Sequence, residues 1–167
     1  MDIKEKVNIL IKKGKYNVAA DLLDKNLSVN KLDPDLWYLR GTVSLKNKNY
    51  PNSLECFEHA ISLKKKPEYF KMKGMALMEM FEFEAAVEEF KESTELAKDV
   101  ECYFYIAVCY MFMSDPESKT YLEYAYLRDK KKTKLLLKQL YNLIFKDSWE
   151  LSKAQQEELK SIIDSVK

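Results

Sequence analysis

The feature that most constrains how this chain can fold is a pattern of large and small residues that recurs after 33 positions. Proline, a large aromatic residue and glycine stand at the same spacing in two segments, first as Pro34, Trp37 and Gly41 and then as Pro67, Phe70 and Gly74. The segments that follow keep the same interval, with the pairs Tyr50 and Phe83, Ser53 and Ala86, Phe57 and Phe90, and Ala60 and Ser93. A fixed period of this size indicates structural repeats that stack on one another.

The repeated units are predicted to be helical. The chain of 167 residues has only three glycines and four prolines, which favours long helices and short loops. Apolar residues recur at spacings of three and four, as on one face of a helix. Prolines suit the first turn of a helix, where their missing N–H has no partner. We expect about ten helices, over residues 2–13, 16–29, 34–46, 51–63, 67–80, 84–98, from near 99, 117–128, 133–145 and 153–166.

These residues resemble the tetratricopeptide repeat, a helix–turn–helix unit of 34 residues with a signature of large and small positions. The large residue near the start of each unit is matched by Trp37, Phe70 and Tyr103, and the small residue four positions later by Gly41, Gly74 and Ala107. The resemblance covers about residues 1–128. It implies an all-α, right-handed superhelix in a single domain, with repeats at about 1–33, 34–66, 67–99 and 100–129 and a C-terminal extension of capping helices at 130–167.

The resemblance also implies a concave face lined by the first helix of each repeat. Carried over to this sequence, the lining positions are Lys4, Asn8, Tyr38, Thr42, Lys71, Met75, Met78, Phe104, Val108, Met111 and Phe112. The face is therefore apolar and rich in Met, a side chain that adapts to irregular partners. We expect a non-catalytic scaffold that binds a peptide or protein segment. The alternative is self-association, with the groove filled by the C-terminal helices or by a second copy.

One version of the family grips the C-terminal carboxylate of chaperones with a set of Lys, Asn and Arg side chains. Lys4 and Asn8 match the first two positions of that set. Leu39 replaces the next Asn, and Glu68 and Met72 replace the basic pair. The sequence therefore does not predict this clamp.

Catalysis, metal binding and cofactors find no support in the pattern of reactive residues. His59 is the only histidine, and a zinc site needs four donors. The three glycines are isolated, so no loop cradles a phosphate. We predict that the chain is not an enzyme and binds no cofactor. Its three cysteines, an odd number, favour reduced thiols and a cytoplasmic protein, and no apolar run approaches the ~18 residues that cross a membrane.

The net charge of +1 conceals an uneven distribution. Residues 1–66 carry 13 basic and 8 acidic groups, residues 67–127 carry 5 and 13, and residues 128–167 carry 10 and 6. Lysine runs at 64–66 and 130–134 could contact RNA without sequence preference, but the chain has only two arginines and no net basic domain. Nucleic acid is therefore an unlikely partner, kept as a minor alternative.

Overall fold

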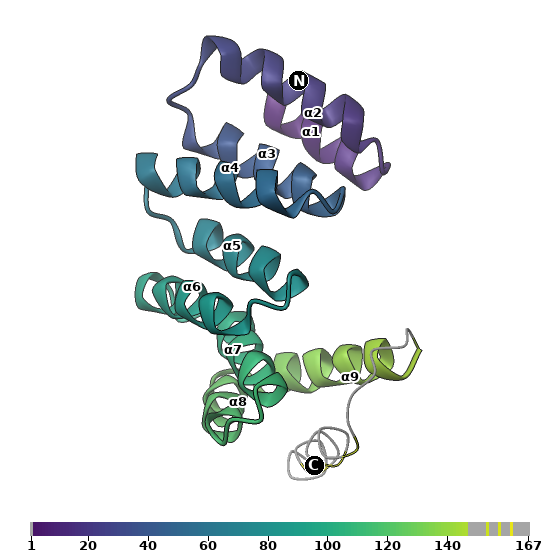
Figure 1. Cartoon of the computed structure of the whole chain (residues 1–167), viewed down its shortest axis with the longest axis vertical. Coiled ribbons are helices and arrows are strands. Elements are labelled where there is room, and N and C mark those ends of the chain that lie inside the picture. Colours follow the sequence, from purple (N-terminus) through teal and green to yellow (C-terminus); the bar gives the residue numbers. More distant parts are fainter. Residues whose placement is uncertain (1, 147–152, 154–156, 158–160, 162–167) are drawn as a thin grey trace. The chain divides into compact units, whose positions relative to one another are not determined.

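The computed structural model describes residues 2–146 together with positions 153, 157 and 161, and the side chains of all of these except residues 143–146. The described part is all-α, as expected, and its helices are α1 (Ile3–Lys12), α2 (Tyr16–Val29), α3 (Pro34–Lys46), α4 (Tyr50–Leu63), α5 (Pro67–Glu79), α6 (Phe83–Leu96), α7 (Val100–Phe112), α8 (Glu117–Arg128) and α9 (Lys130–Lys146) (Figure 1). The tenth expected helix, over 153–166, lies outside the described residues apart from isolated positions. None of the described helices is long and apolar enough to span a bilayer.

The helices fall into two compact units, Met1–Glu82 with α1–α5 and Phe83–Lys167 with α6–α9. The boundary lies between the two helices of the expected third repeat. That the whole chain forms one solenoid domain stays a prediction.

Helix starts follow the sequence signals. The Asp33 carboxylate accepts hydrogen bonds from the backbone N–H groups of Asp35 and Leu36 at the start of α3, where Pro34 occupies the first turn. Asp99 caps α7 in the same way through the N–H of Glu101. Both caps satisfy backbone donors that a helix leaves without an internal partner.

The turn between the two helices of each repeat contains one residue with a positive φ. These residues are Gly14 (φ +68°), Lys48 (+59°), Phe81 (+62°) and Ser114 (+57°). They recur every 33 or 34 positions although only the first is a glycine. The repeat is therefore more regular in its backbone than in its residue types.

The core of unit 1 is built by the small and large signature residues. Phe57, Ala60 and Ser53 of α4 are fully buried, and a cluster of buried aliphatic residues joins α1, α2 and α3. A Cβ placed on Gly41 would lie 2.6 Å from Cε1 of Phe57. The mid-helix glycine of α3 thus makes room for an aromatic ring.

Ion pairs at matching positions join consecutive repeats in unit 1. Nε of Arg40 on α3 lies 2.6 Å from a carboxylate oxygen of Asp24 on α2. Thirty-three residues later, Nζ of Lys73 on α5 lies 3.2 Å from a carboxylate oxygen of Glu58 on α4. Each pair links the first helix of one repeat to the second helix of the repeat before it.

In unit 2, α7 is buried on most of its circumference. It packs against α6, α8 and α9, and its buried residues include Cys102, Ile106, Ala107 and Cys109. The first helix of the fourth repeat therefore has neighbours on three sides within this unit.

Candidate functional site

The first helices of the repeats in unit 1, α1, α3 and α5, lie next to one another in order. We call the surface that they form the first-helix face. Seven of the residues predicted to line a groove belong to these helices: Lys4, Asn8, Tyr38, Thr42, Lys71, Met75 and Met78. Asn8 is exposed and the other six are half-buried, so each keeps part of its surface accessible.

A polar cluster around Asp35 fixes the N-terminal edge of this face. The carboxylate of Asp35 on α3 accepts hydrogen bonds from Nζ of Lys4 on α1 at 2.9 Å and from Nζ of Lys66 at 2.6 Å. The hydroxyl of Tyr69 on α5 donates a third hydrogen bond to it. Three consecutive repeats thus meet at one carboxylate.

The electrostatics of the cluster follow from these contacts. The hydrogen bonds from Lys4, Lys66 and Tyr69 hold the pKa of Asp35 well below its usual range. The same bonds raise the pKa of Lys4 and of Lys66. Burial, followed by the hydrogen bond to Asp35, raises the pKa of Tyr69 to about 12. At neutral pH the carboxylate of Asp35 is therefore ionised and both lysines are protonated, while the Tyr69 hydroxyl keeps the proton that it donates.

Tyr38 connects the polar cluster to the rest of the face. Its ring stacks on the ring of Tyr69 with centroids 5.1 Å apart, and its pKa is raised by burial and by the charge of Glu68. One turn later, the Thr42 hydroxyl donates a hydrogen bond to the Tyr38 carbonyl. The methionines stand at Met75 and Met78 on the neighbouring α5, so the face passes from charged to apolar along these helices.

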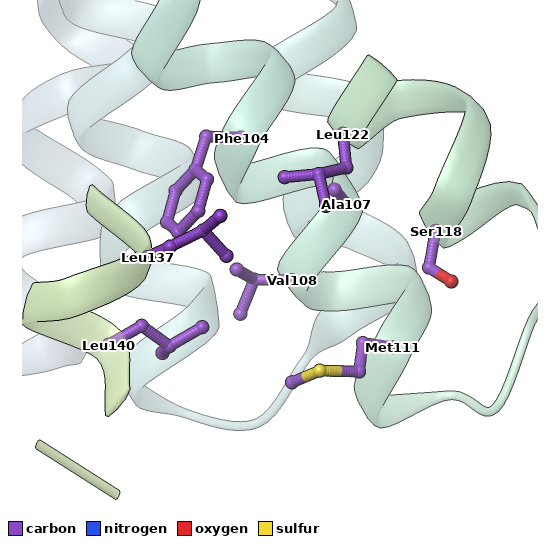
Figure 2. A pocket seen from close by; sticks show the side chains of 8 residues that line it. All are labelled: Phe104, Ala107, Val108, Met111, Ser118, Leu122, Leu137 and Leu140. Atoms are coloured by element: carbon purple, nitrogen blue, oxygen red, sulfur yellow. The ribbon is translucent and has the colours of Figure 1, made fainter. Parts of the chain in front are cut away.

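The residues predicted on α7 are placed differently. Met111 is 2% exposed, and Phe104 and Val108 are also buried. Figure 2 shows Leu137 and Leu140 of α9 directed toward Phe104 and Val108, and all of these residues line one small apolar pocket. In unit 2 the helix α9 thus covers three of the four positions of α7 that the resemblance assigns to a groove, namely Phe104, Val108 and Met111.

An ion pair anchors α9 there. Nζ of Lys132 lies 2.9 Å from a carboxylate oxygen of Glu101 on α7. Glu101 occupies the same repeat position as Asp35, two repeats later, after an interval of 66 residues. Phe112, the last predicted groove residue, is half-buried and its ring stacks on that of Phe83 at 5.0 Å.

Sequence reasoning missed Asp35, Lys66 and Tyr69 as parts of the site. The available signal was an acidic residue at the same position of three consecutive repeats: Asp35, Glu68 and Glu101. Only the stacking of the repeats shows that Lys4 of the preceding repeat and Tyr69 of the following one, together with Lys66, reach the carboxylate of Asp35.

The reactive residues do not gather into a site in the described part of the chain. His59 is exposed and stacks on Trp37 with ring centroids 4.6 Å apart. Among the described residues, no three His, Cys, Asp or Glu side chains are placed to hold a metal ion. Burial raises the pKa of Cys56 to about 11 and that of Cys109 to about 12, so these thiols stay protonated and unreactive at neutral pH.

Comparison with known proteins identifies the repeats. The tetratricopeptide repeat family matches residues 34–67 and 68–100. No curated protein matches the sequence.

Several solved structures share the fold. The crystal structure of MamA protein has a TM-score of 0.72 at 17% identity, covering 90% of this chain and 76% of that one. YrrB, described as a TPR protein with an unusual peptide-binding site, has a TM-score of 0.69 at 18% identity, covering 96% and 82%. The first TPR domain of human RPAP3 has a TM-score of 0.64 at 21% identity, covering 67% and 90%. The first TPR of Spaghetti (RPAP3) bound to the HSP90 peptide SRMEEVD has a TM-score of 0.64 at 21% identity, covering 68% and 91%. At these identities the likeness shows the fold, a tetratricopeptide-type helical solenoid.

Proposed function

Because this chain is a tetratricopeptide repeat protein, with matched repeats at residues 34–67 and 68–100, we propose that it is a non-catalytic scaffold that binds a peptide or protein segment. Binding takes place on the first-helix face of unit 1. The observation that carries the proposal is the composition of that face: half-buried Tyr38, Met75 and Met78 beside a charged cluster that is held rigidly by hydrogen bonds.

The chemistry of the face favours an amphipathic segment. Methionine side chains are flexible and polarizable, so they fit apolar residues of irregular shape. Tyrosine combines a large apolar ring with a hydroxyl and is a frequent anchor at interfaces. The neighbouring structures support peptide binding by this fold, since YrrB has a peptide-binding site and RPAP3 binds an HSP90 peptide.

The α7 positions take no part in this proposal. Phe104, Val108 and Met111 are buried against α9, so a partner could reach them only by displacing that helix. This agrees with the alternative in which the chain fills part of its groove with its own C-terminal helices. Peptide binding by unit 1 and filling of the groove by α9 in unit 2 concern different parts of the chain and are compatible.

The three cysteines carry free thiols and are buried. A reducing compartment suits such residues, and we therefore propose the cytoplasm as the location.

The proposal is tested with peptides selected on the immobilised protein from a displayed library of random 12-residue sequences. Met75→Lys with Met78→Lys should weaken binding of the selected peptides at least tenfold, about 1.4 kcal/mol, because two charges replace apolar contacts. The matched control is Val18→Lys with Val29→Lys, which places the same charges on exposed apolar residues of α2. Circular dichroism verifies that both variants keep their helicity.

Equal binding by wild type and the Met75/Met78 variant would place the peptide site elsewhere and remove the proposal. The peptide SRMEEVD serves as a second probe, and we expect no binding. Lys4 is already paired with Asp35, and Leu39, Glu68 and Met72 occupy the other positions that a carboxylate clamp requires.

A further inference from the structure

Unit 2 presents a helix face that is strongly acidic. Helix α6 carries Glu84, Glu88, Glu92 and Glu95, all exposed, at intervals of four, four and three residues. Residues at these intervals lie above one another on one side of a helix. The opposite side of α6, with Ala86, Val87 and Phe90, is buried, so the four carboxylates form a stripe that faces solvent. We call this stripe the acidic face of α6.

The same unit presents a basic face on α9. This helix contains six lysines and no acidic residue. Lys131, Lys134 and Lys138 are exposed and surround Leu135, which is 55% exposed. Leu136 and Leu137 on the other side of the helix are buried. The three lysines and Leu135 are the basic face of α9.

The two faces match in spacing. With a rise of about 1.5 Å per residue, Lys131, Lys134 and Lys138 span about 10 Å along α9. Glu84, Glu88 and Glu92 span about 12 Å along α6 by the same measure. Two helices laid side by side could therefore bring each ammonium group close to a carboxylate. Leu135 and the exposed Leu96 at the end of α6 add apolar surface at the edge of such a contact.

A second copy of this chain is the occupant that the charges favour. We propose that the acidic face of α6 in one copy binds the basic face of α9 in another. The net charge of the whole chain is only +1, so no overall repulsion opposes the approach of two copies. Proteins with net charge near zero also associate more readily than highly charged ones. Since every copy carries both faces, the contact either closes into a two-fold dimer or continues as a chain.

The contact is weak and depends strongly on salt, because all its charges are exposed. The Debye length, the distance over which two charges attract each other before salt screens them, falls from about 30 Å at 0.01 M salt to about 3 Å at 1 M. We expect concentration-dependent association at 20 mM NaCl and at least a tenfold weaker association at 500 mM NaCl, measured by sedimentation equilibrium of the full chain.

Charge reversal tests the pairing directly. One variant carries Lys131→Glu, Lys134→Glu and Lys138→Glu, and the other carries Glu84→Lys, Glu88→Lys and Glu92→Lys. Each should be monomeric at 20 mM NaCl, because its two faces now have the same sign. An equimolar mixture of the two variants should associate again at least as strongly as wild type, because opposite faces are restored between the copies.

The control variant is Lys12→Glu with Lys13→Glu and Lys15→Glu, which makes the same charge change on exposed residues of unit 1 and should associate like wild type. A monomeric wild type at 20 mM NaCl and millimolar concentration would overturn the inference. So would a mixture that stays monomeric, or a control that loses association like the α9 variant. Binding of a 20-nucleotide RNA by monomeric wild type that the α9 variant loses would assign the basic face to a polyanion instead. The result does not depend on the Met75/Met78 test, which probes a different unit.

Discussion

Asp35 is the residue at which three repeats of unit 1 are tied together. A single surface ion pair contributes little, with typical values of about 0.2–1 kcal/mol. Here one carboxylate accepts from two ammonium groups and a hydroxyl; Lys4 comes from α1, and Lys66 and Tyr69 come from the start of α5. These hydrogen bonds fix how α1, α3 and α5 lie against one another on the first-helix face, where we propose that a peptide binds.

Replacing this carboxylate should destabilise the fold in a pH-dependent way. Asp35→Asn should lower the free energy of unfolding by about 1 kcal/mol at pH 7, a modest value because the side chain keeps 34% of its surface exposed. The pKa of Asp35 is lowered in the folded state, so its contribution is complete above about pH 4, the ordinary aspartate value. It is lost as the pH falls through the depressed pKa. Urea unfolding at pH 7 and pH 2.5 measures both effects.

The control for this prediction is Asp21→Asn at an exposed position of α2, which should change stability by less than about 0.5 kcal/mol. An Asp35→Asn difference that is the same at both pH values would show that shape, and not charge, holds the cluster.

Residue-level prediction succeeded where the signal was local. The prolines in the first turns of α3, α4 and α5 could be read from the sequence itself, and the structure confirms them. The role of Asp35 could not, because its partners come from 31 and 34 residues away. The positive φ of the turn residue Phe81 could not be predicted either, because a bulky exposed residue gives no local signal for that backbone conformation.

At the scale of elements, α9 is the helix whose placement decides which groove positions are covered. The sequence predicted a helix over residues 133–145, but not the helix against which it packs. The structure places its leucines on α7, beside Phe104 and Val108. The fourth repeat has the most apolar first helix, and its own chain covers that surface.

Loosening α9 should expose this apolar surface. Leu137 is 5% exposed, and Leu→Ala at buried sites costs about 2–5 kcal/mol. Leu137→Ala should therefore speed amide hydrogen exchange in α9 and increase the fluorescence of bound ANS. Leu135→Ala is the matched control on the same helix, because that side chain is largely exposed, and it should change neither signal. Equal effects of the two substitutions would mean that α9 is held by something other than this contact.

At the scale of the whole molecule, the same buried residues of the repeat signature form the core of each of the two units. The signature residues Phe57 and Phe90 stand 33 positions apart, one in each unit, and both are fully buried. In a stacked-repeat protein each repeat contacts only its neighbours, so stability is close to a sum of local terms. Damage to one repeat should therefore stay local.

The equivalent substitutions Phe57→Ala and Phe90→Ala test this locality. Each should cost about 3–5 kcal/mol, the usual range for a buried Phe→Ala change. Hydrogen exchange should accelerate in α3, α4 and α5 for Phe57→Ala, with α8 protected as in wild type. For Phe90→Ala it should accelerate in α6 and α7, with α1 and α2 unchanged. Damage confined to one repeat cannot expose the amides of helices that it does not contact. Loss of protection throughout the chain in either variant would therefore show that the two units unfold together as a single cooperative structure.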